Sequence, residues 1–360
     1  MDFRNIKMVT DYFSGLPMPG GAVLIKKDHE VLYRYSSGFA DIEAGVPFTG
    51  DESVFLYSCT KMFTCTAALQ LYEKGLLNLD DPLSRFYPEA DKRITLKHLF
   101  SMTAGYDYDM DCLEHFRGGH AGTQEIVREI VKKPLRFAPG TSYLYSLAHD
   151  IIGGIVELVS GERFSDYIDG HILKPLGLKN TTFRVTDEVL GKIAPQYMFD
   201  KNAGKSLRVD KANIYAFTQE YDSGGAGLVS TLSDLSVFLD ALACGGVGET
   251  GNRILKEDTI KLYSTNVLSP DILRIFNFLE PSLVGHGYAL GVRTFIDPVY
   301  GDGLIPVGEF GWGGAASSQE IVDPVNHISL AYTTHVLEGP QSQLVAQLLH
   351  ALYLDLSEKL

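Results

Sequence analysis

Segments typical of β-strands lie near both ends of this 360-residue chain, and helical patterns fill the middle. Residues 21–25 and 31–35 are rich in β-forming residues and flank a short polar run, which predicts a hairpin. Strand-like segments return at 288–296, 319–322 and 328–333. Strands from the two ends of a chain can share one sheet, and strands joined by hairpins pair antiparallel.

This arrangement predicts an α+β fold: an antiparallel sheet of about five strands from both termini, flanked by helices, plus an all-helical lobe. A short opening helix and an amphipathic helix over residues 341–354 would cover the sheet. We expect a single catalytic domain over residues 1–360. Its sheet lobe would combine 1–57 with 270–360, and 58–269 would form a mainly helical lobe. A cleft between lobes is the usual place for a site.

The charge balance limits the partners of the chain. It has 31 Lys and Arg against 45 Asp and Glu, a formal net charge of −14, which disfavours nucleic acids and anionic membrane surfaces. No apolar run reaches about 18 residues, and the first seven residues lack a signal-peptide stretch. The four cysteines form no C-x-x-C motif, so we expect free thiols. The sequence therefore predicts a cytoplasmic protein with small-molecule partners.

A serine and a lysine share one face of a helix that begins near residue 58. Residues 58–74 are apolar nearly all round, which indicates a buried helix, and a buried Lys61 would be unusual. Ser58 stands three residues before Lys61, so their side chains are neighbours. A desolvated lysine has a lowered pKa and can accept a proton from a serine nucleophile. Alternatively, Ser58 only caps the helix and Lys61 extends to the surface, because S-x-x-K alone is a weak signal.

Two further segments carry candidate site residues. Tyr145 follows a Pro-Gly turn at the mouth of another apolar helix, and a neighbouring ammonium would lower its pKa. This motif by itself is more typical of a core tyrosine with a satisfied hydroxyl. The segment 309–316 contains three glycines and two alanines around the chain's single tryptophan, Trp312. Glycines in a strand allow close approach of a ligand, so we expect this segment to form a cleft wall.

These three motifs, in this order, resemble the serine β-lactamase and penicillin-binding-protein superfamily. The closer resemblance is to its class C β-lactamase-like branch, which includes the family VIII carboxylesterases. It extends over nearly the whole chain, through family-like runs at 79–83, 94–105, 174–178 and 225–231. The resemblance implies a β-lactamase/transpeptidase-like fold.

The resemblance also implies roles for individual residues. Ser58 would be the acylated nucleophile, and Lys61 and Tyr145 the proton-transfer pair. The backbone N–H groups of Ser58 and Ala315 would form the oxyanion hole. No metal or cofactor is implied, and His29-Glu30 lacks the second histidine of a zinc protease.

Two departures from the β-lactamase pattern concern the substrate. Trp312, Gly313 and Gly314 stand where β-lactamases carry Lys-Thr-Gly, whose lysine helps to hold the antibiotic's carboxylate. Leu147 replaces the asparagine of Tyr-x-Asn, which contacts the substrate amide. The Trp-Gly-Gly motif and the Tyr-Ser-x-x-x-Asp pattern that ends at Asp150 are both similar to family VIII esterases.

The sequence thus predicts a serine hydrolase that acts through an acyl-enzyme, a carboxylesterase on small esters, with Leu147 and residues 312–314 near the substrate. One alternative is a β-lactamase, D,D-peptidase or D-aminopeptidase-like amidohydrolase, with a β-lactam-like substrate. A second is a non-catalytic ligand-binding relative. Residues 106–122, rich in Asp and Gly, form either a flap over the site or a solvated loop.

Overall fold

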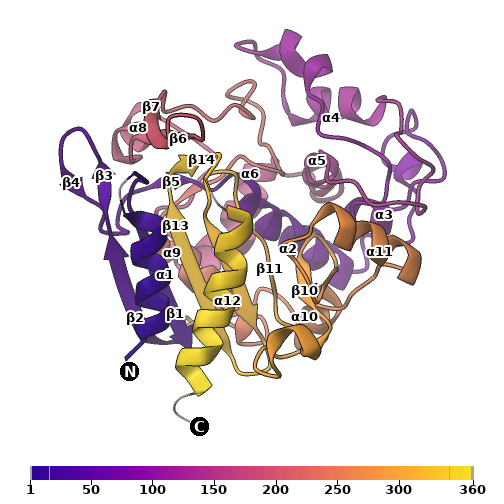
Figure 1. Ribbon diagram of the computed structural model, residues 1–360. Coiled ribbons are helices and arrows are strands. Elements are labelled where there is room, and N and C mark those ends of the chain that lie inside the picture. Colours follow the sequence, from indigo (N-terminus) through magenta and orange to yellow (C-terminus); the bar gives the residue numbers. More distant parts are fainter. Residues whose placement is uncertain (1, 16, 340, 358–360) are drawn as a thin grey trace.

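An antiparallel sheet forms the centre of the computed structural model, which describes residues 2–15, 17–339 and 341–357 (Figure 1). Within these residues its seven strands run in the order β2–β1–β13–β12–β11–β10–β9, and every pairing is antiparallel. The strands are β1 (Gly21–Lys27), β2 (Glu30–Ser37), β9 (His286–Tyr288), β10 (Arg293–Phe295), β11 (Phe310–Gly311), β12 (Gln319–Asp323) and β13 (Ile328–Thr334).

The antiparallel sheet built from both termini is confirmed, with seven strands where about five were expected. The segment predicted as one strand over 288–296 is a tight hairpin, because the chain reverses at Gly291, whose φ is +90°. β11 has only two residues, too few for an alternating pattern.

Segments near the two ends of the chain lie side by side in the sheet, as its second and third strands. β1 pairs along its length with β13, from Gly21 opposite Thr334 to Lys27 opposite Ile328. Helices α1 (Arg4–Ser14) and α12 (Gln341–Ser357) lie side by side in front of the sheet in Figure 1, and α9 (Leu232–Ala243) packs behind β1 and β13. None of the described helices is long and apolar enough to cross a membrane.

The middle of the chain is mainly helical. Its helices are α2 (Thr60–Glu73), α3 (Leu96–Phe100), α4 (Thr123–Val131), α5 (Ala148–Ser160), α6 (Phe164–Ile168), α7 (Lys174–Leu176), α8 (Asp187–Lys192), α10 (Glu257–Tyr263) and α11 (Pro270–Leu279). Short 3-10 segments are η1 (Tyr57–Cys59), η2 (Leu83–Arg85), η3 (Asp111–Phe116) and η5 (Pro298–Gly301), and η4 (Asp169–Leu173) is a π-helical turn.

This region also contains strands that the sequence did not indicate. The hairpin β6 (Gln196–Asp200) and β7 (Lys205–Val209) turns at Gly204, and β6 pairs in parallel with β14 (Val336–Leu337). The helical lobe is therefore not all-helical. Most of the hairpin lies at the surface, so its residues lack the apolar alternation of a half-buried strand. The remaining short pairs are β3 (Phe39–Asp41) with β4 (Val46–Pro47), and β5 (Val54–Phe55) with β8 (Val229–Ser230).

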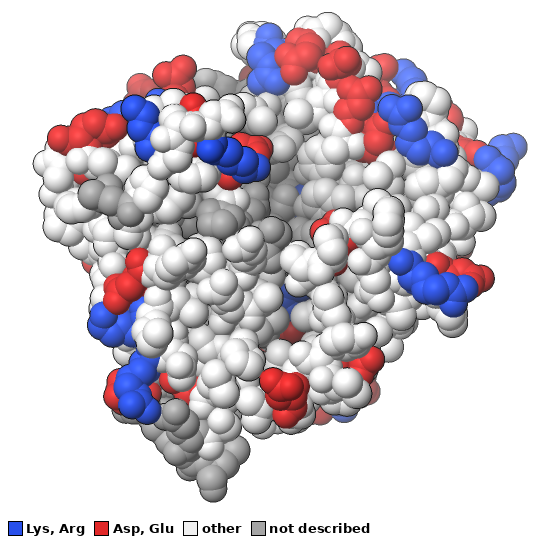
Figure 2. All heavy atoms as spheres, viewed as in Figure 1, with Lys and Arg blue, Asp and Glu red and all other residues white. Residues whose placement is uncertain are grey.

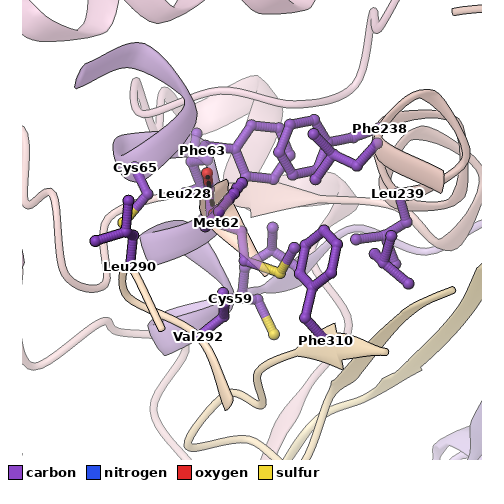
Figure 3. Packing of buried hydrophobic residues seen from close by; sticks show 14 of the residues in the cluster. Cys59, Met62, Phe63, Cys65, Leu228, Phe238, Leu239, Leu290, Val292 and Phe310 are labelled. Atoms are coloured by element: carbon purple, nitrogen blue, oxygen red, sulfur yellow. Dashed lines mark hydrogen bonds between the residues drawn. The ribbon is translucent and has the colours of Figure 1, made fainter. Parts of the chain in front are cut away.

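Helix α2 lies in the core, as its apolar sequence predicts. Every residue from Thr60 to Leu71 is buried. In Figure 3, Met62 and Phe63 point into the packed cluster that includes Phe310 of the sheet. Phe63 stacks on Phe238 of α9, with ring centres 3.7 Å apart. The start of α2 is thus held from several sides, and side chains at that end have a fixed position.

Candidate active site

Ser58 lies in η1, immediately before α2. Its neighbours Tyr57 and Cys59 are buried, whereas Ser58 is partly exposed. Tyr57 has a φ of +48°, in the left-handed region that side chains other than glycine rarely adopt. The buried Tyr57 hydroxyl donates to Gln196 Oε1 over 2.7 Å, which helps to hold this strained residue. The turn leaves the Ser58 side chain facing a cleft.

The cleft has a volume of about 660 Å³. Five predicted site residues line it: Ser58, Tyr145, Trp312, Gly313 and Ala315. Figure 2 shows a hollow in this face of the molecule, where most of the surface is uncharged and the Lys, Arg, Asp and Glu side chains lie mainly around it.

Lys61 is fully buried behind Ser58. Its Nζ lies 3.1 Å from Ser58 Oγ and donates to the carbonyl oxygen of Gly225 over 2.8 Å. Burial lowers the pKa of Lys61 to about 8, and the charge of Asp150 opposes this shift. At pH 7 roughly a tenth of Lys61 is therefore uncharged, rising to about half at pH 8, and this neutral amine can accept the Ser58 proton.

Tyr145 contacts both the lysine and the tryptophan. The Trp312 indole N–H donates to the Tyr145 hydroxyl over 3.1 Å, and the two rings stack at 5.4 Å. Lys61 Nζ lies 4.8 Å from the centre of the Tyr145 ring. Burial raises the pKa of Tyr145, although hydrogen bonds with Ser58 and Trp312 oppose the rise. The expected lowering by a neighbouring ammonium does not occur, because desolvation of the phenolate is the larger effect.

Tyr108 is a contact that sequence reasoning missed. Its hydroxyl accepts from Lys61 Nζ over 3.2 Å, and its ring stacks on that of Tyr145 at 5.3 Å. It lies in the segment 106–122, which the sequence left open as a flap or a solvated loop. No spacing links Tyr108 to the motifs, because it reaches Lys61 across 47 residues of sequence.

Asp150 organises the backbone behind Lys61. Its buried carboxylate accepts from the Tyr221 hydroxyl over 2.6 Å, from Ser223 Oγ over 2.7 Å and from the Gly225 N–H over 3.2 Å. These bonds fix the turn whose Gly225 carbonyl accepts from Lys61.

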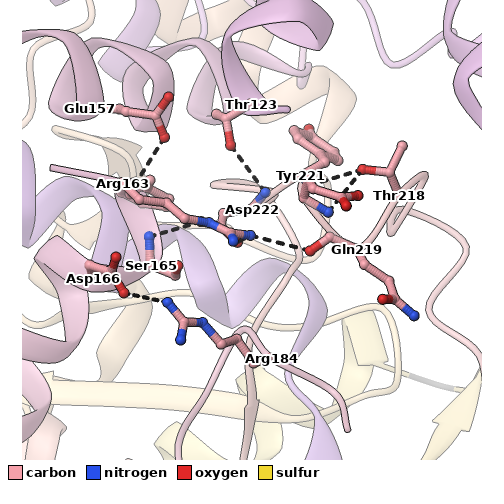
Figure 4. Close-up of polar contacts among 12 residues, drawn as sticks. Thr123, Glu157, Arg163, Ser165, Asp166, Arg184, Thr218, Gln219, Tyr221 and Asp222 are labelled. Carbon is pink, nitrogen blue, oxygen red and sulfur yellow. Dashed lines mark hydrogen bonds and ion pairs between the residues drawn. The ribbon is translucent and has the colours of Figure 1, made fainter. Parts of the chain in front are cut away.

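A second buried carboxylate anchors the same segment (Figure 4). Asp222 accepts from two nitrogens of the Arg163 guanidinium, each over 2.8 Å, and from the Ser165 N–H over 3.0 Å. The Asp222 N–H donates to Thr123 Oγ1. The chain that leads to the turn at 223–225 is thus tied to α4 and α6.

Two predicted substrate-binding residues do not line the cleft. Leu147 is buried in the core at the start of α5, and its N–H donates to the carbonyl of Asp107. Gly314 lies behind the cleft wall, where a Cβ atom would come within 2.3 Å of the Leu56 carbonyl oxygen. Its neighbour Ala315 does line the cleft, which is compatible with the predicted oxyanion hole.

One group of metal-ligating residue types occurs among the described residues, away from this cleft. Donor atoms of His29, Asp240 and Cys244 lie within 4.8 Å of one another. Lys26 Nζ lies 3.7 Å from the Asp240 carboxylate and is its counter-ion. The four cysteines of the chain are free thiols, as predicted. That the protein needs no metal or cofactor stays a prediction.

Comparisons with known proteins agree with this geometry. The Beta-lactamase family model matches residues 9–355. Esterase EstB of Burkholderia gladioli is 27% identical over 93% of this chain and 90% of its own length. A putative D-alanyl-D-alanine carboxypeptidase of Escherichia coli K12 is 25% identical over 89% of this chain and 79% of its own.

Among solved structures, EstCE1, described as a hydrolase with promiscuous acyltransferase activity, superposes with a TM-score of 0.82. It is 26% identical, and the match covers 97% of this chain and 98% of that one. From the match over residues 9–355 and the shared fold, the chain belongs to the beta-lactamase family and is a serine hydrolase.

Proposed function

We propose that this protein is a carboxylesterase that hydrolyses small esters through an acyl-enzyme on Ser58. The observation that carries this proposal is the contact of Trp312, which stands where β-lactamases of this family carry a lysine. Its indole N–H donates to the Tyr145 hydroxyl. The position therefore supports a proton-transfer residue and offers no cation to a substrate carboxylate.

The proton route follows from the two pKa shifts. Ser58 Oγ attacks the ester carbonyl, and its proton passes to the neutral Lys61 amine 3.1 Å away. Tyr145, whose pKa is raised, stays protonated and its hydroxyl can donate to the leaving alkoxide oxygen. Lys61 then returns the proton to the Tyr145 oxygen. In the second half, water attacks the acyl carbonyl and its proton passes to Lys61. Ser58 Oγ leaves with the proton of the Tyr145 hydroxyl, and Lys61 returns its proton to the Tyr145 oxygen.

The amidohydrolase alternative is supported by the carboxypeptidase relative. Against it, Leu147 is buried and carries no amide to orient a peptide bond. The non-catalytic alternative is disfavoured because Ser58, Lys61 and Tyr145 are all present and in contact.

The test compares p-nitrophenyl acetate and butyrate with nitrocefin. A charge-assisted hydrogen bond to the substrate carboxylate is worth about 1.5–3 kcal/mol, and its loss favours the ester by roughly 10- to 150-fold. Loss of the orienting asparagine contact adds to this, so kcat/KM for the esters should exceed that for nitrocefin by at least about 100-fold. A kcat/KM for nitrocefin equal to or higher than that for the esters would contradict the esterase proposal and favour the amidohydrolase alternative.

Ser58→Ala should lower the kcat for esters by at least about 10³-fold and abolish labelling by a fluorophosphonate probe. Ser282→Ala is the matched control, since Ser282 also lines the cleft. Ester turnover retained in Ser58→Ala, or a label mapped to another residue, would contradict the assignment of the nucleophile.

A further inference from the structure

One acidic side chain in the cleft has no counter-ion. Glu280 follows α11, lines the cleft and is half-buried. Among the described residues, no hydrogen bond or ion pair involves its carboxylate. Burial raises the pKa of Glu280, and its charge is among those that raise the pKa of Tyr145. The carboxylate is therefore partly desolvated and electrostatically coupled to the candidate active site.

The other charged residues that line the cleft are paired. Lys201 Nζ lies 3.6 Å from Glu338, and both side chains are largely exposed. Arg293 is buried, and its guanidinium donates to both oxygens of Glu309 over 2.7 and 2.8 Å. Each cation thus has an acidic partner of its own, and in the part of the chain that the structure describes neither forms an ion pair with Glu280. Among the described charged residues that line the cleft, Glu280 is thus the one whose side chain has no partner of opposite charge.

Aromatic rings also line the cleft. Tyr108, Tyr145, Tyr215 and Trp312 line the same cleft. Tyr108 and Tyr145 stack at 5.3 Å, and Tyr215 meets Tyr108 edge-on at 5.7 Å. Aromatic faces attract ammonium groups, most strongly quaternary ones, because the ring face carries negative potential. A carboxylate and an aromatic wall in one cleft both favour a cation.

We propose that Glu280 is a specificity-determining residue that makes the cleft prefer esters carrying an ammonium group over neutral or carboxylate-bearing ones. This inference deepens the proposed function and, for its turnover readout, rests on it. A bound ammonium would also restore the interactions that the Glu280 carboxylate loses by burial. No change in the chemistry at Ser58 is involved.

The experiment compares isosteric pairs of esters that differ in charge. Butyrylcholine is paired with 3,3-dimethylbutyl butyrate, and p-nitrophenyl 4-(trimethylammonio)butyrate with p-nitrophenyl 5,5-dimethylhexanoate, so that the ammonium lies on the alcohol or the acyl side. In wild type the ratio of kcat/KM, cation over neutral, should be about tenfold in at least one pair. Glu280→Gln should reduce that ratio to about twofold, because only the aromatic contribution remains.

The control is Asp271→Asn. Asp271 is an exposed acid of α11 that pairs with Arg274 and does not line the cleft, so its variant should keep the wild-type ratio. If Glu280→Gln does not fold, the salt dependence of the cation-to-neutral ratio in the wild type tests the role of Glu280. This ratio should fall when NaCl is raised from about 0.05 to about 0.5 M, since salt screens the attraction of the carboxylate.

A binding measurement separates this inference from the proposed function. Trp312 is the chain's single tryptophan and lines the cleft, so its fluorescence reports ligand binding without turnover. Ser58→Ala should bind butyrylcholine more tightly than its neutral isostere, and Ser58→Ala/Glu280→Gln should lose the difference. If no ester is hydrolysed but this difference is found, the esterase proposal fails and the role of Glu280 stands. A cation-to-neutral ratio near one in wild type, or an unchanged ratio in Glu280→Gln, overturns the inference.

Discussion

Lys61 is the residue on which the chemistry of the cleft depends. A lysine with no exposed surface is unusual, and here it is satisfied by a serine hydroxyl, a tyrosine hydroxyl and a backbone carbonyl. All three are neutral groups, so the ammonium form has no direct carboxylate partner. Burial therefore dominates and lowers the pKa of Lys61 to about 8.

The pKa of Lys61 predicts the pH dependence of the reaction. A general base must be unprotonated, so kcat/KM for p-nitrophenyl butyrate should rise with pH through about 8 and then level off. In Asp150→Asn the rise of kcat/KM should occur at lower pH, because the Asp150 charge stabilises the ammonium form of Lys61. Initial rates from pH 6 to pH 10, corrected for spontaneous hydrolysis, give the pH of this rise in the wild type and in Asp150→Asn. A rise of kcat/KM that occurs at higher pH in Asp150→Asn than in the wild type would contradict the assignment of Lys61 as the base.

Two elements must stay in register for the site to form. η1 carries Ser58, and the turn between β11 and β12 carries Trp312 and Ala315 to the same cleft. The backbones meet where Gly314 lies against Leu56, the residue before η1. The close approach leaves no room for a side chain at this position.

Gly314→Ala should separate these elements. The added Cβ would lie 2.3 Å from the Leu56 carbonyl oxygen, a backbone atom that cannot move aside. Overpacking of this kind typically costs about 1–3 kcal/mol, so we expect a lower Tm and a loss of kcat/KM of about tenfold or more. Thermal unfolding measures the Tm, and ester hydrolysis measures kcat/KM.

Gly313→Ala is the matched control for this prediction. Its Cβ would approach only the end of the Gln319 side chain, at 2.7 Å, and that side chain can rotate away. The loss of activity should therefore be clearly smaller than in Gly314→Ala. Equal effects at the two positions would show that the contact with Leu56 does not set the register.

At the scale of the molecule, the fold closes by joining the two ends of the chain. Beyond the β1–β13 pairing, α12 caps the first turn of α1. The buried Asp355 carboxylate accepts from the N–H groups of Asn5 and Ile6, and from the Asn5 side chain over 2.8 Å. Unpaired N–H groups at a helix start favour such a negative charge.

Asp355→Ala should lower the free energy of unfolding by about 1–3 kcal/mol, because it removes this cap and leaves N–H groups unsatisfied. Urea unfolding measures the change, and Asp271→Ala, at an exposed acid of α11, should alter stability by no more than about 0.5 kcal/mol. Ester kcat/KM should be retained, since the cap is not part of the cleft. A stability equal to wild type would contradict the cap's role.

Local spacing along the chain is enough to predict several features of the fold and of the site. The hairpin of β1 and β2, the helix of α12 and the all-round burial of α2 follow from periodicity, which records how each segment meets the core. The approach of Lys61 to Ser58 belongs to the same class, because residues three apart on a helix are neighbours whatever packs around them.

Contacts between distant segments, by contrast, cannot be predicted from local spacing and follow from the folded chain. The bond from Trp312 to Tyr145 spans 167 residues, and that from Lys61 to Gly225 spans 164. The direction of the Tyr145 pKa shift also follows from the fold, because it depends on how deeply the ring is buried. The unpaired state of Glu280 depends on which cations the fold brings near it. Local patterns record a residue's own preference for water or core, whereas these properties depend on the neighbours that folding supplies.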